Sequence, residues 1–346
     1  AGAVEKPPGE EVTDSSELLY YLLQSFHAKS SAQRETFRHL GLLTEAVPGG
    51  QAIRAVFHGS PAHDAGLRLG DTVISLDGKP FHPVLTLNPQ IGDNPDLTNS
   101  INPQIGYSRN LATSGNPLPL TYNRNGTEQT VAVSPVHGNL FDAMGTASLD
   151  SPQQFSSGNK IIGYVRLWSF DRSTDGLLSF RRLIDSLDHC DGLILDVRDS
   201  YGFIDANHLD RFFPTRSSYF EIRNQHSDLW QTQQSPRTEQ DYYGKAVVVI
   251  QNSGTRAGAE LFAYQLAKLP RVVSLGSRTA GKAGQVSLDQ ATRTVTYRPG
   301  RDVTLDGMLL ESNGIAPERS VAIPQSAPST QDPQFDAAIL ALMELM

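Results

Sequence analysis

Residues 247–260 read Val-Val-Val-Ile-Gln-Asn-Ser-Gly-Thr-Arg-Ala-Gly-Ala-Glu, and this stretch decides the fold. It begins with four apolar residues in a row, which is typical of a strand that is buried on both faces of a parallel sheet. Small and polar residues follow, and then a helix is predicted over 259–269. A loop that leads into a helix N-terminus directs free amide groups at one point, and such a point suits a negatively charged oxygen.

Strands and helices alternate on both sides of this stretch. The pattern predicts strands over 161–167, 193–197, 245–251 and 271–275, and helices over 175–187, 259–269 and 332–346. Residues 286–297 alternate as strands do. This order of elements favours an α/β fold with a largely parallel sheet that helices cover.

The first part of the chain has a different pattern. A helix is predicted over 14–35, and short strands over 52–57 and 71–79. A hairpin is predicted around Asn125-Gly126, where a tight turn is preferred to the alternative of a glycosylation acceptor. Residues 83–117 are rich in Asn, Pro and Gly, and they are interpreted as an inserted loop that is either a lid or a surface insertion.

Composition limits the classes of function. A length of 346 residues predicts two or three domains, and the net charge of -8 with a pI near 5.6 disfavours nucleic acid as a partner. No apolar run is long enough for a membrane-spanning helix. Cys190 is the single cysteine, so an intrachain disulfide is excluded and a buried thiol is expected. The start at Ala1 suggests a mature product whose targeting segment lies outside this sequence.

A peptide-binding module is indicated near the start of the chain. The residues His39-Leu40-Gly41-Leu42, with Ser-Pro-Ala at 60–62 and Gly-Asp-Thr-Val-Ile-Ser-Leu-Asp-Gly at 70–78, resemble a PDZ domain over 37–137 with the insertion at 83–117. The resemblance implies that the amides of Leu40, Gly41 and Leu42 bind the terminal carboxylate of a peptide. The peptide would then add as a strand to a sheet edge.

The stretches 247–260 and 275–286 together resemble the tail-specific (C-terminal processing) serine peptidases. That family has a nucleophilic serine three residues before a glutamate, and a lysine 25 residues after the serine. Here Glu260 marks position 257, and Lys282 lies 25 residues after it. Two more segments agree with the family pattern, Gly163 to Phe170 and Asn313 to Pro317, so the resemblance covers about 37–325.

The resemblance implies a domain plan and a set of partners. The plan has an N-terminal tail and helix over 1–36, a mostly β PDZ domain over 37–137, and a ClpP/crotonase-like protease core over 138–346. The partners implied are protein or peptide substrates with a free C-terminus, and a second copy that binds through the terminal helices 14–35 and 332–346. A bacterial periplasmic or other extracytoplasmic location is expected.

The residue at the nucleophile position departs from the family pattern, because Ala257 has no hydroxyl group. In an active form, the resemblance implies that a serine at 257 attacks the substrate carbonyl and that Lys282 accepts its proton in the neutral amine form. Gly258 and Gly202 would donate to the oxyanion. Gln285 would orient the lysine, although the family places this glutamine one residue later. No cofactor or metal is required.

Several alternatives remain open or are disfavoured. Ala257 either replaces the serine of an active enzyme or belongs to a natural pseudopeptidase that acts as a peptide-binding scaffold, and a small-ligand binder is a third class. Residues 276–282 fit the start of a phosphate-binding loop, but Ala283 and the strand pattern after it disfavour nucleotide binding. Ser253 has the wrong spacing to Lys282 for a substitute nucleophile. The histidines, His58 and His63 among them, lack the spacing of metal ligands.

Overall fold

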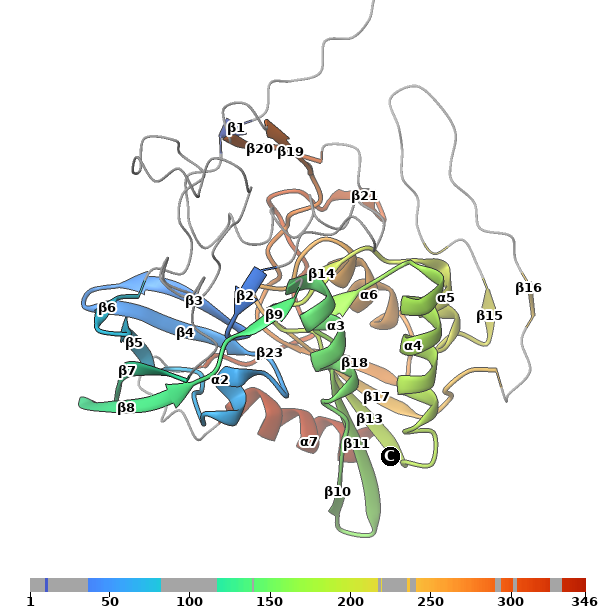
Figure 1. The fold of residues 1–346 in the computed structure, drawn as a ribbon. Coiled ribbons are helices and arrows are strands. Elements are labelled where there is room, and N and C mark those ends of the chain that lie inside the picture. Colours follow the sequence, from blue (N-terminus) through green and yellow to red (C-terminus); the bar gives the residue numbers. More distant parts are fainter. Residues whose placement is uncertain are drawn as a thin grey trace, which may run out of the picture. The chain divides into compact units, whose positions relative to one another are not determined.

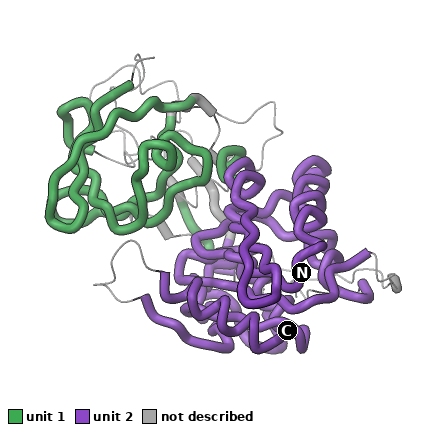
Figure 2. Tube along the Cα trace, turned by 90° about the horizontal axis from the view of Figure 1, so that it is seen from below, with its two compact units in different colours: residues 1–144, 285–298 green, residues 145–284, 299–346 purple. Residues whose placement is uncertain are grey.

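The computed structural model describes residues 10–11, 37–81, 117–138, 140–216, 219, 235–236, 241–289, 294–300, 304–323 and 332–346. The chain forms two compact units, shown in Figure 2. Unit 1 contains 1–144 and 285–298, and unit 2 contains 145–284 and 299–346. The helix predicted over 14–35 and nearly all of the insertion at 83–117 lie outside the described residues.

Unit 1 is built around an antiparallel sheet in the order β3-β4-β5-β7-β8, with β6 paired to β5. The turn predicted at Asn125-Gly126 is confirmed, because both residues have positive φ values of 54° and 81° and join β7 to β8. The elements of this unit are β1 (Glu10–Glu11), β2 (Phe37–His39), β3 (Leu42–Val47), β4 (Gly50–Val56), α2 (Pro61–Asp64), β5 (Thr72–Leu76), β6 (Lys79–Pro80), β7 (Leu118–Arg124), β8 (Thr127–Val133), β9 (Val136–Gly138), β19 (Gln285–Asp289) and β20 (Thr294–Arg298).

Unit 2 is a six-stranded sheet in the order β10-β11-β13-β17-β18-β23 (Figure 1). The strands from β11 to β23 are parallel, and β10 is an antiparallel edge. The helix α3 (Leu140–Leu149) carries the chain from unit 1 into unit 2. The elements of this unit are β10 (Gln153–Ser157), β11 (Lys160–Arg166), β12 (Ser169–Phe170), α4 (Thr174–Asp185), β13 (Gly192–Asp196), β14 (Tyr201–Gly202), α5 (Ala206–Asp210), β15 (Thr215–Arg216), β16 (Ser235–Pro236), β17 (Ala246–Gln251), α6 (Gly258–Leu266), β18 (Val272–Gly276), β21 (Thr304–Leu305), β22 (Met308–Leu309), β23 (Arg319–Ser320) and α7 (Pro333–Leu345).

Helices cover both faces of this parallel sheet, which explains its continuous apolar strands. Along β17, Val247 and Val249 pack in a cluster with residues of α4, α5 and α6, whereas Val248 and Ile250 pack in a second cluster with α7. Figure 1 shows α7 on one side of the strands and the other three helices on the opposite side. The predicted α/β architecture with a largely parallel sheet is therefore confirmed.

Candidate active site

Three loops of unit 2 meet at one edge of its sheet. They follow β13, β17 and β18, and because these strands are parallel their carboxyl ends lie at the same edge, where α/β proteins form their sites. Backbone hydrogen bonds join the loops to one another. Arg256 N donates to Ser200 O, and Ala280 N donates to Thr255 O, both at 3.0 Å. The loop that carries position 257 is thus fixed against both of its neighbours.

Ala257 has a backbone conformation that alanine rarely adopts, with φ 51° and ψ -121°. It is the residue immediately before α6, and its side chain is half-buried. Such a conformation costs on the order of 1–3 kcal/mol in a residue other than glycine and is concentrated at functional sites. A sharp, strained turn from strand to helix is also the device that exposes a nucleophile at the top of a sheet. The backbone at 257 therefore has the form of a nucleophile turn, although the side chain is a methyl group.

The two residues predicted to bind an oxyanion are neighbours. A Cβ atom built on Gly258 would lie 2.6 Å from Gly202 O and 2.5 Å from Ile204 N. Those distances are too short for a carbon atom, so only glycine fits at 258 without a backbone shift. Gly202 has a φ of 143°, and a Cβ atom there would lie 2.3 Å from Phe170 O. Both glycines are required by the close approach of backbone to backbone.

The direction of the Gly202 amide follows from its strand. The amides of Tyr201 and Phe203 donate to the carbonyl groups of residues 168 and 170, at 3.2 and 2.8 Å. Amide directions alternate along a strand, so the amide of Gly202 points to the opposite side. The carbonyl of Gly202 lies on that side too, against Gly258. The amide and the carbonyl of Gly202 therefore face the turn before α6.

The carboxylate of Glu260 brings positions 257 and 282 together. Its Oε2 atom accepts hydrogen bonds from the amides of Ala257 and Lys282, each at 3.1 Å. Its Oε1 atom accepts from Thr279 Oγ1 at 2.6 Å and from Gly281 N at 2.7 Å. Glu260 is fully buried, and this burial raises the pKa of its carboxyl group while the four donors oppose the shift. The backbone segments that carry the two predicted dyad positions are therefore held by one side chain.

A second buried carboxylate fixes the chain just beyond Lys282. Glu311 is 4% exposed, and its Oε2 atom accepts from Ala283 N and Gly300 N, both at 3.0 Å. The consecutive amides of residues 281, 282 and 283 are thus all bound by Glu260 or Glu311. The side chain of Lys282 is half-buried. Gln285 begins β19, and its side chain lies outside the described residues.

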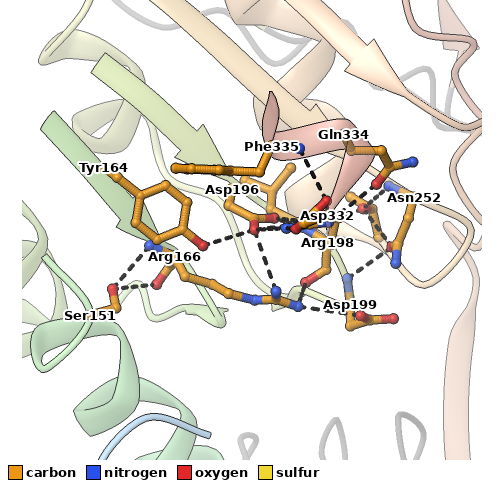
Figure 3. Close-up of polar contacts among 12 residues, drawn as sticks. Ser151, Tyr164, Arg166, Asp196, Arg198, Asp199, Asn252, Asp332, Gln334 and Phe335 are labelled. Atoms are coloured by element: carbon orange, nitrogen blue, oxygen red, sulfur yellow. Dashed lines mark hydrogen bonds and ion pairs between the residues drawn. The ribbon is translucent and has the colours of Figure 1, made fainter. Parts of the chain in front are cut away.

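Buried charges support the loop after β13 (Figure 3). Asp196, the last residue of β13, is fully buried, and its carboxylate accepts from Tyr164 Oη at 3.0 Å and from Arg198 Nη2 at 2.6 Å. Arg166 Nη1 adds a contact of 3.4 Å. Burial acts to raise the pKa of Asp196, but the two guanidinium groups outweigh it and hold that pKa well below its ordinary range. Asp196 is therefore a permanent anion in this network.

The sequence pattern marks Glu260 only as a landmark for position 257, and it indicates no role for Glu311, Asp196, Arg166 or Arg198. A signal for Asp196 was present, because an acidic residue that ends a continuous apolar strand requires a partner when the strand is buried. Arg198, two residues later, was the available partner. No local signal marks Glu311, whose contacts join segments far apart in the sequence.

The structure also bears on the phosphate-binding loop, the substitute nucleophile and the metal site considered above. Residues 277–283 lead into β19 rather than into a helix, so the strand-loop-helix order of a phosphate-binding loop is absent there. Ser253 is exposed. Cys190 is buried, as expected. Within the described part of the chain, no group of three or more His, Cys, Asp and Glu side chains is suited to a metal ion, and every helix is too short or too polar to span a bilayer.

The residues predicted to bind a peptide carboxylate lie in unit 1. Leu40 and Leu42 are buried, and Gly41 between them has a φ of 73°. A Cβ atom on Gly41 would lie 2.3 Å from Ser60 Cβ, and Ser60 Oγ donates to Gly41 O at 3.2 Å. Gly41 therefore lies in a tight turn next to the edge strand β3.

A part of unit 2 is similar to a known peptidase family. Residues 161–321 match the model of peptidase family S41. The matched range contains the loops after β13, β17 and β18 and the buried carboxylates of Asp196, Glu260 and Glu311.

One curated protein is similar in sequence to part of the chain. The chain is 29% identical over 191 residues to the "Putative Tricorn-like protease C-terminal subunit" of Sulfurisphaera tokodaii, an alignment that covers 53% of this chain and 21% of that protein. The chain thus spans about a fifth of the length of this curated relative.

Two solved structures share the fold. One is a photosystem II D1 C-terminal processing protease, with a TM-score of 0.51, 16% identity, and coverage of 92% of this chain and 80% of that chain. The other is described as "Putative S41 protease from Bacteroides fragilis", with a TM-score of 0.53, 15% identity, and coverage of 90% and 84%. At these identities the likeness concerns the fold.

Proposed function

We propose that this protein has the site of a serine endopeptidase of the C-terminal processing type, with position 257 as the nucleophile position. One observation carries the proposal, namely that Ala257 is held in a strained turn before α6 while its amide and that of Lys282 bind the same oxygen of Glu260. Strain of this kind has no structural use for an alanine, but it would aim a serine hydroxyl at a substrate.

The proposed mechanism applies to the form with serine at 257. The hydroxyl oxygen attacks the substrate carbonyl carbon, and Lys282 in its neutral form takes the hydroxyl proton. The amides of Gly258 and Gly202 stabilise the oxyanion. The scissile C–N bond then breaks as the Lys282 ammonium group returns its proton to the leaving amine, and water hydrolyses the acyl-enzyme. The chain with Ala257 lacks the attacking atom and is expected to be inert, since loss of a nucleophile can cost about 10⁶ in rate.

The proposed substrate is an unstructured protein tail. Support comes from the turn at Gly41 beside the edge strand β3, which fits the PDZ-type capture of a C-terminal carboxylate.

A ClpP/crotonase-like core, an extracytoplasmic location and a homodimer through the terminal helices belong to the same proposal. Most apolar residues of α7 pack in the core of unit 2. Leu340, 67% exposed, is the large apolar side chain of α7 that is exposed for such a dimer contact.

The test is to restore the hydroxyl with Ala257→Ser and to incubate the folded variant with a disordered protein. Cleavage is expected, and adding Lys282→Ala should abolish it. Lys268→Ala in the same background is the matched control, because Lys268 lies on an exposed surface with Asp306 as its partner. Peptide binding without cleavage by Ala257→Ser would instead support the pseudopeptidase scaffold, an alternative that the alanine itself keeps open.

A further inference from the structure

Arg198 makes two sets of contacts that the proposed mechanism does not use. Its guanidinium group binds Asp196 through Nε and Nη2, at 2.9 and 2.6 Å. The same group binds Asp332, with Nη1 3.0 Å from Oδ1 and Nη2 2.7 Å from Oδ2, and Nη1 also donates to Gln334 Oε1 at 3.3 Å. Asp332 is the N-cap of α7, where its Oδ1 atom accepts from Phe335 N at 3.0 Å. One side chain therefore connects the end of β13 to the start of the C-terminal helix (Figure 3).

The loop that begins at Arg198 leads directly to the proposed oxyanion donor. Asp199, with a φ of 57°, donates its amide to Asn252 Oδ1 at 2.9 Å. Ser200 O accepts from Arg256 N, and Gly202 follows two residues later. A displacement at Arg198 would be transmitted to Gly202 within four residues.

Arg166 reinforces the same loop from its other side. Its Nη2 atom donates to Arg198 O at 3.1 Å and to Asp199 Oδ2 at 3.3 Å. Its guanidinium group also lies 3.9 Å from the centre of the Trp168 ring. The loop is thus held by charged contacts at both its backbone and its side chains.

The composition of this network favours a geometric role. The side chains of Asp196 and Arg198 are 0% and 7% exposed. A buried ion pair usually gives little net stability compared with apolar residues of similar volume, so its presence is better explained by the arrangement that it enforces. The planar fork of arginine contacts two carboxylates at once, which the single ammonium group of lysine does less well.

We propose that Arg198 is a positioning residue for the oxyanion loop, and that the N-terminus of α7 is thereby a required part of the site. This proposal rests on the proposed peptidase function for its catalytic consequence. Its structural part concerns the chain as it stands and does not depend on the nucleophile.

The test begins with the Ala257 chain and with hydrogen exchange of the amides at 198–203. Arg198→Lys and Asp332→Asn should each accelerate this exchange by roughly tenfold or more, while peptides from β17 keep their protection. Asparagine is as good an N-cap as aspartate, so an effect of Asp332→Asn reports the lost carboxylate and not a frayed helix. The matched control is Glu344→Gln, which removes the exposed Arg319–Glu344 contact at the other end of α7 and should leave exchange at 198–203 unchanged.

The catalytic consequence is measured in the Ala257→Ser background. There Arg198→Lys and Asp332→Asn should lower kcat by roughly 10- to 100-fold with little change in KM, since a misplaced donor weakens the transition state more than substrate binding. Glu344→Gln should keep full kcat. If Ala257→Ser itself shows no activity, the proposed function fails, and the exchange data still decide the role of Arg198.

Two results would overturn the positioning role. One is unchanged exchange at 198–203 in both variants. The other is a uniform acceleration that includes β17, which would show that Arg198 only stabilises unit 2 as a whole. Unchanged kcat in an active Ala257→Ser background would remove the catalytic consequence.

Discussion

The amide nitrogen atoms of Ala257 and Lys282 share one acceptor, the Oε2 atom of Glu260, although 25 residues separate them in the sequence. Glutamate is well suited to this task, because an ionised carboxylate accepts several hydrogen bonds and donates none.

Glu260→Gln should destabilise the protein by about 2–4 kcal/mol. The carboxamide has one oxygen in place of two, so its NH₂ group would face buried donors and leave them unpaired. Urea unfolding of both proteins measures the difference in the free energy of unfolding. Glu344→Gln, an exposed position, serves as the control and should change it little. Equal stability of the Glu260→Gln and parent proteins would contradict the role given to this carboxylate.

Ala257→Gly should raise the free energy of unfolding by about 1 kcal/mol. Glycine relieves the strain of φ 51° and ψ -121°, and this gain exceeds its larger entropy loss on folding. The control is Ala263→Gly, which lies inside α6 and should be destabilising by at least ~1 kcal/mol. Thermal and urea unfolding give both values. A loss of stability at 257 equal to that at 263 would mean that the turn is not strained.

Gly258→Ala should disturb the site through its backbone contacts with residues 202–204. The new methyl group would lie 2.5–2.6 Å from backbone atoms, so a loss of about 1–3 kcal/mol in stability is expected. In the Ala257→Ser background, kcat should fall by about 100-fold because the oxyanion donors shift. Gly145→Ala is the matched helical control, since its Cβ atom would meet only Ser169 Oγ at 3.8 Å. Full activity in Gly258→Ala would exclude this glycine from the oxyanion site.

His208 should make stability depend on pH. It is 1% exposed, packs edge-on against Phe170 and Phe180, and its Nδ1 atom accepts from Asp205 N at 3.0 Å. Burial lowers the pKa of His208 to about 4. An unfolded histidine titrates near 6.5, so the unfolded state binds the proton first as the pH falls. Stability from this residue is complete above about pH 6.5 and decreases by roughly 3 kcal/mol towards pH 4.

The measurement is urea unfolding at several pH values between 7 and 4. His208→Gln should reduce the loss of stability over this range, whereas the exposed His63→Gln should keep the full loss. A pH dependence that is identical in the parent protein and in His208→Gln would show that another group is responsible.

The sequence was sufficient for the elements whose local pattern and tertiary environment agree. The apolar run of β17 and the Asn125-Gly126 turn encode their structures within a few residues, whereas the spacing between Glu260 and Lys282 was informative only through the family resemblance. By contrast, β10 was not predicted, because Gln153, Gln154 and Ser156 are exposed on an edge strand and give no apolar alternation. Its pairing with β11 supplies the stability that its own residues do not.

The site was predictable only in part, for a related reason. The sequence predicts roles for the glycines 202 and 258, but their mutual contact depends on how two parallel strands end at the same edge. In the network of Asp196, Arg198 and Asp332, the contact between Arg198 and Asp332 joins residues that are 134 positions apart in the sequence. No local spacing encodes such a contact.

The bond from Glu311 to the amides of both Ala283 and Gly300 has a consequence for the evolution of the chain. Between these two residues the polypeptide leaves unit 2, contributes β19 and β20 to unit 1, and returns. The Glu311 carboxylate holds the two ends of this segment, Ala283 and Gly300, close together. The entropy cost of closing a loop increases only slowly with its length, so a longer segment between these ends would cost little more. Insertions and substitutions between Ala283 and Gly300 would therefore be tolerated while the backbone around Lys282 keeps its position.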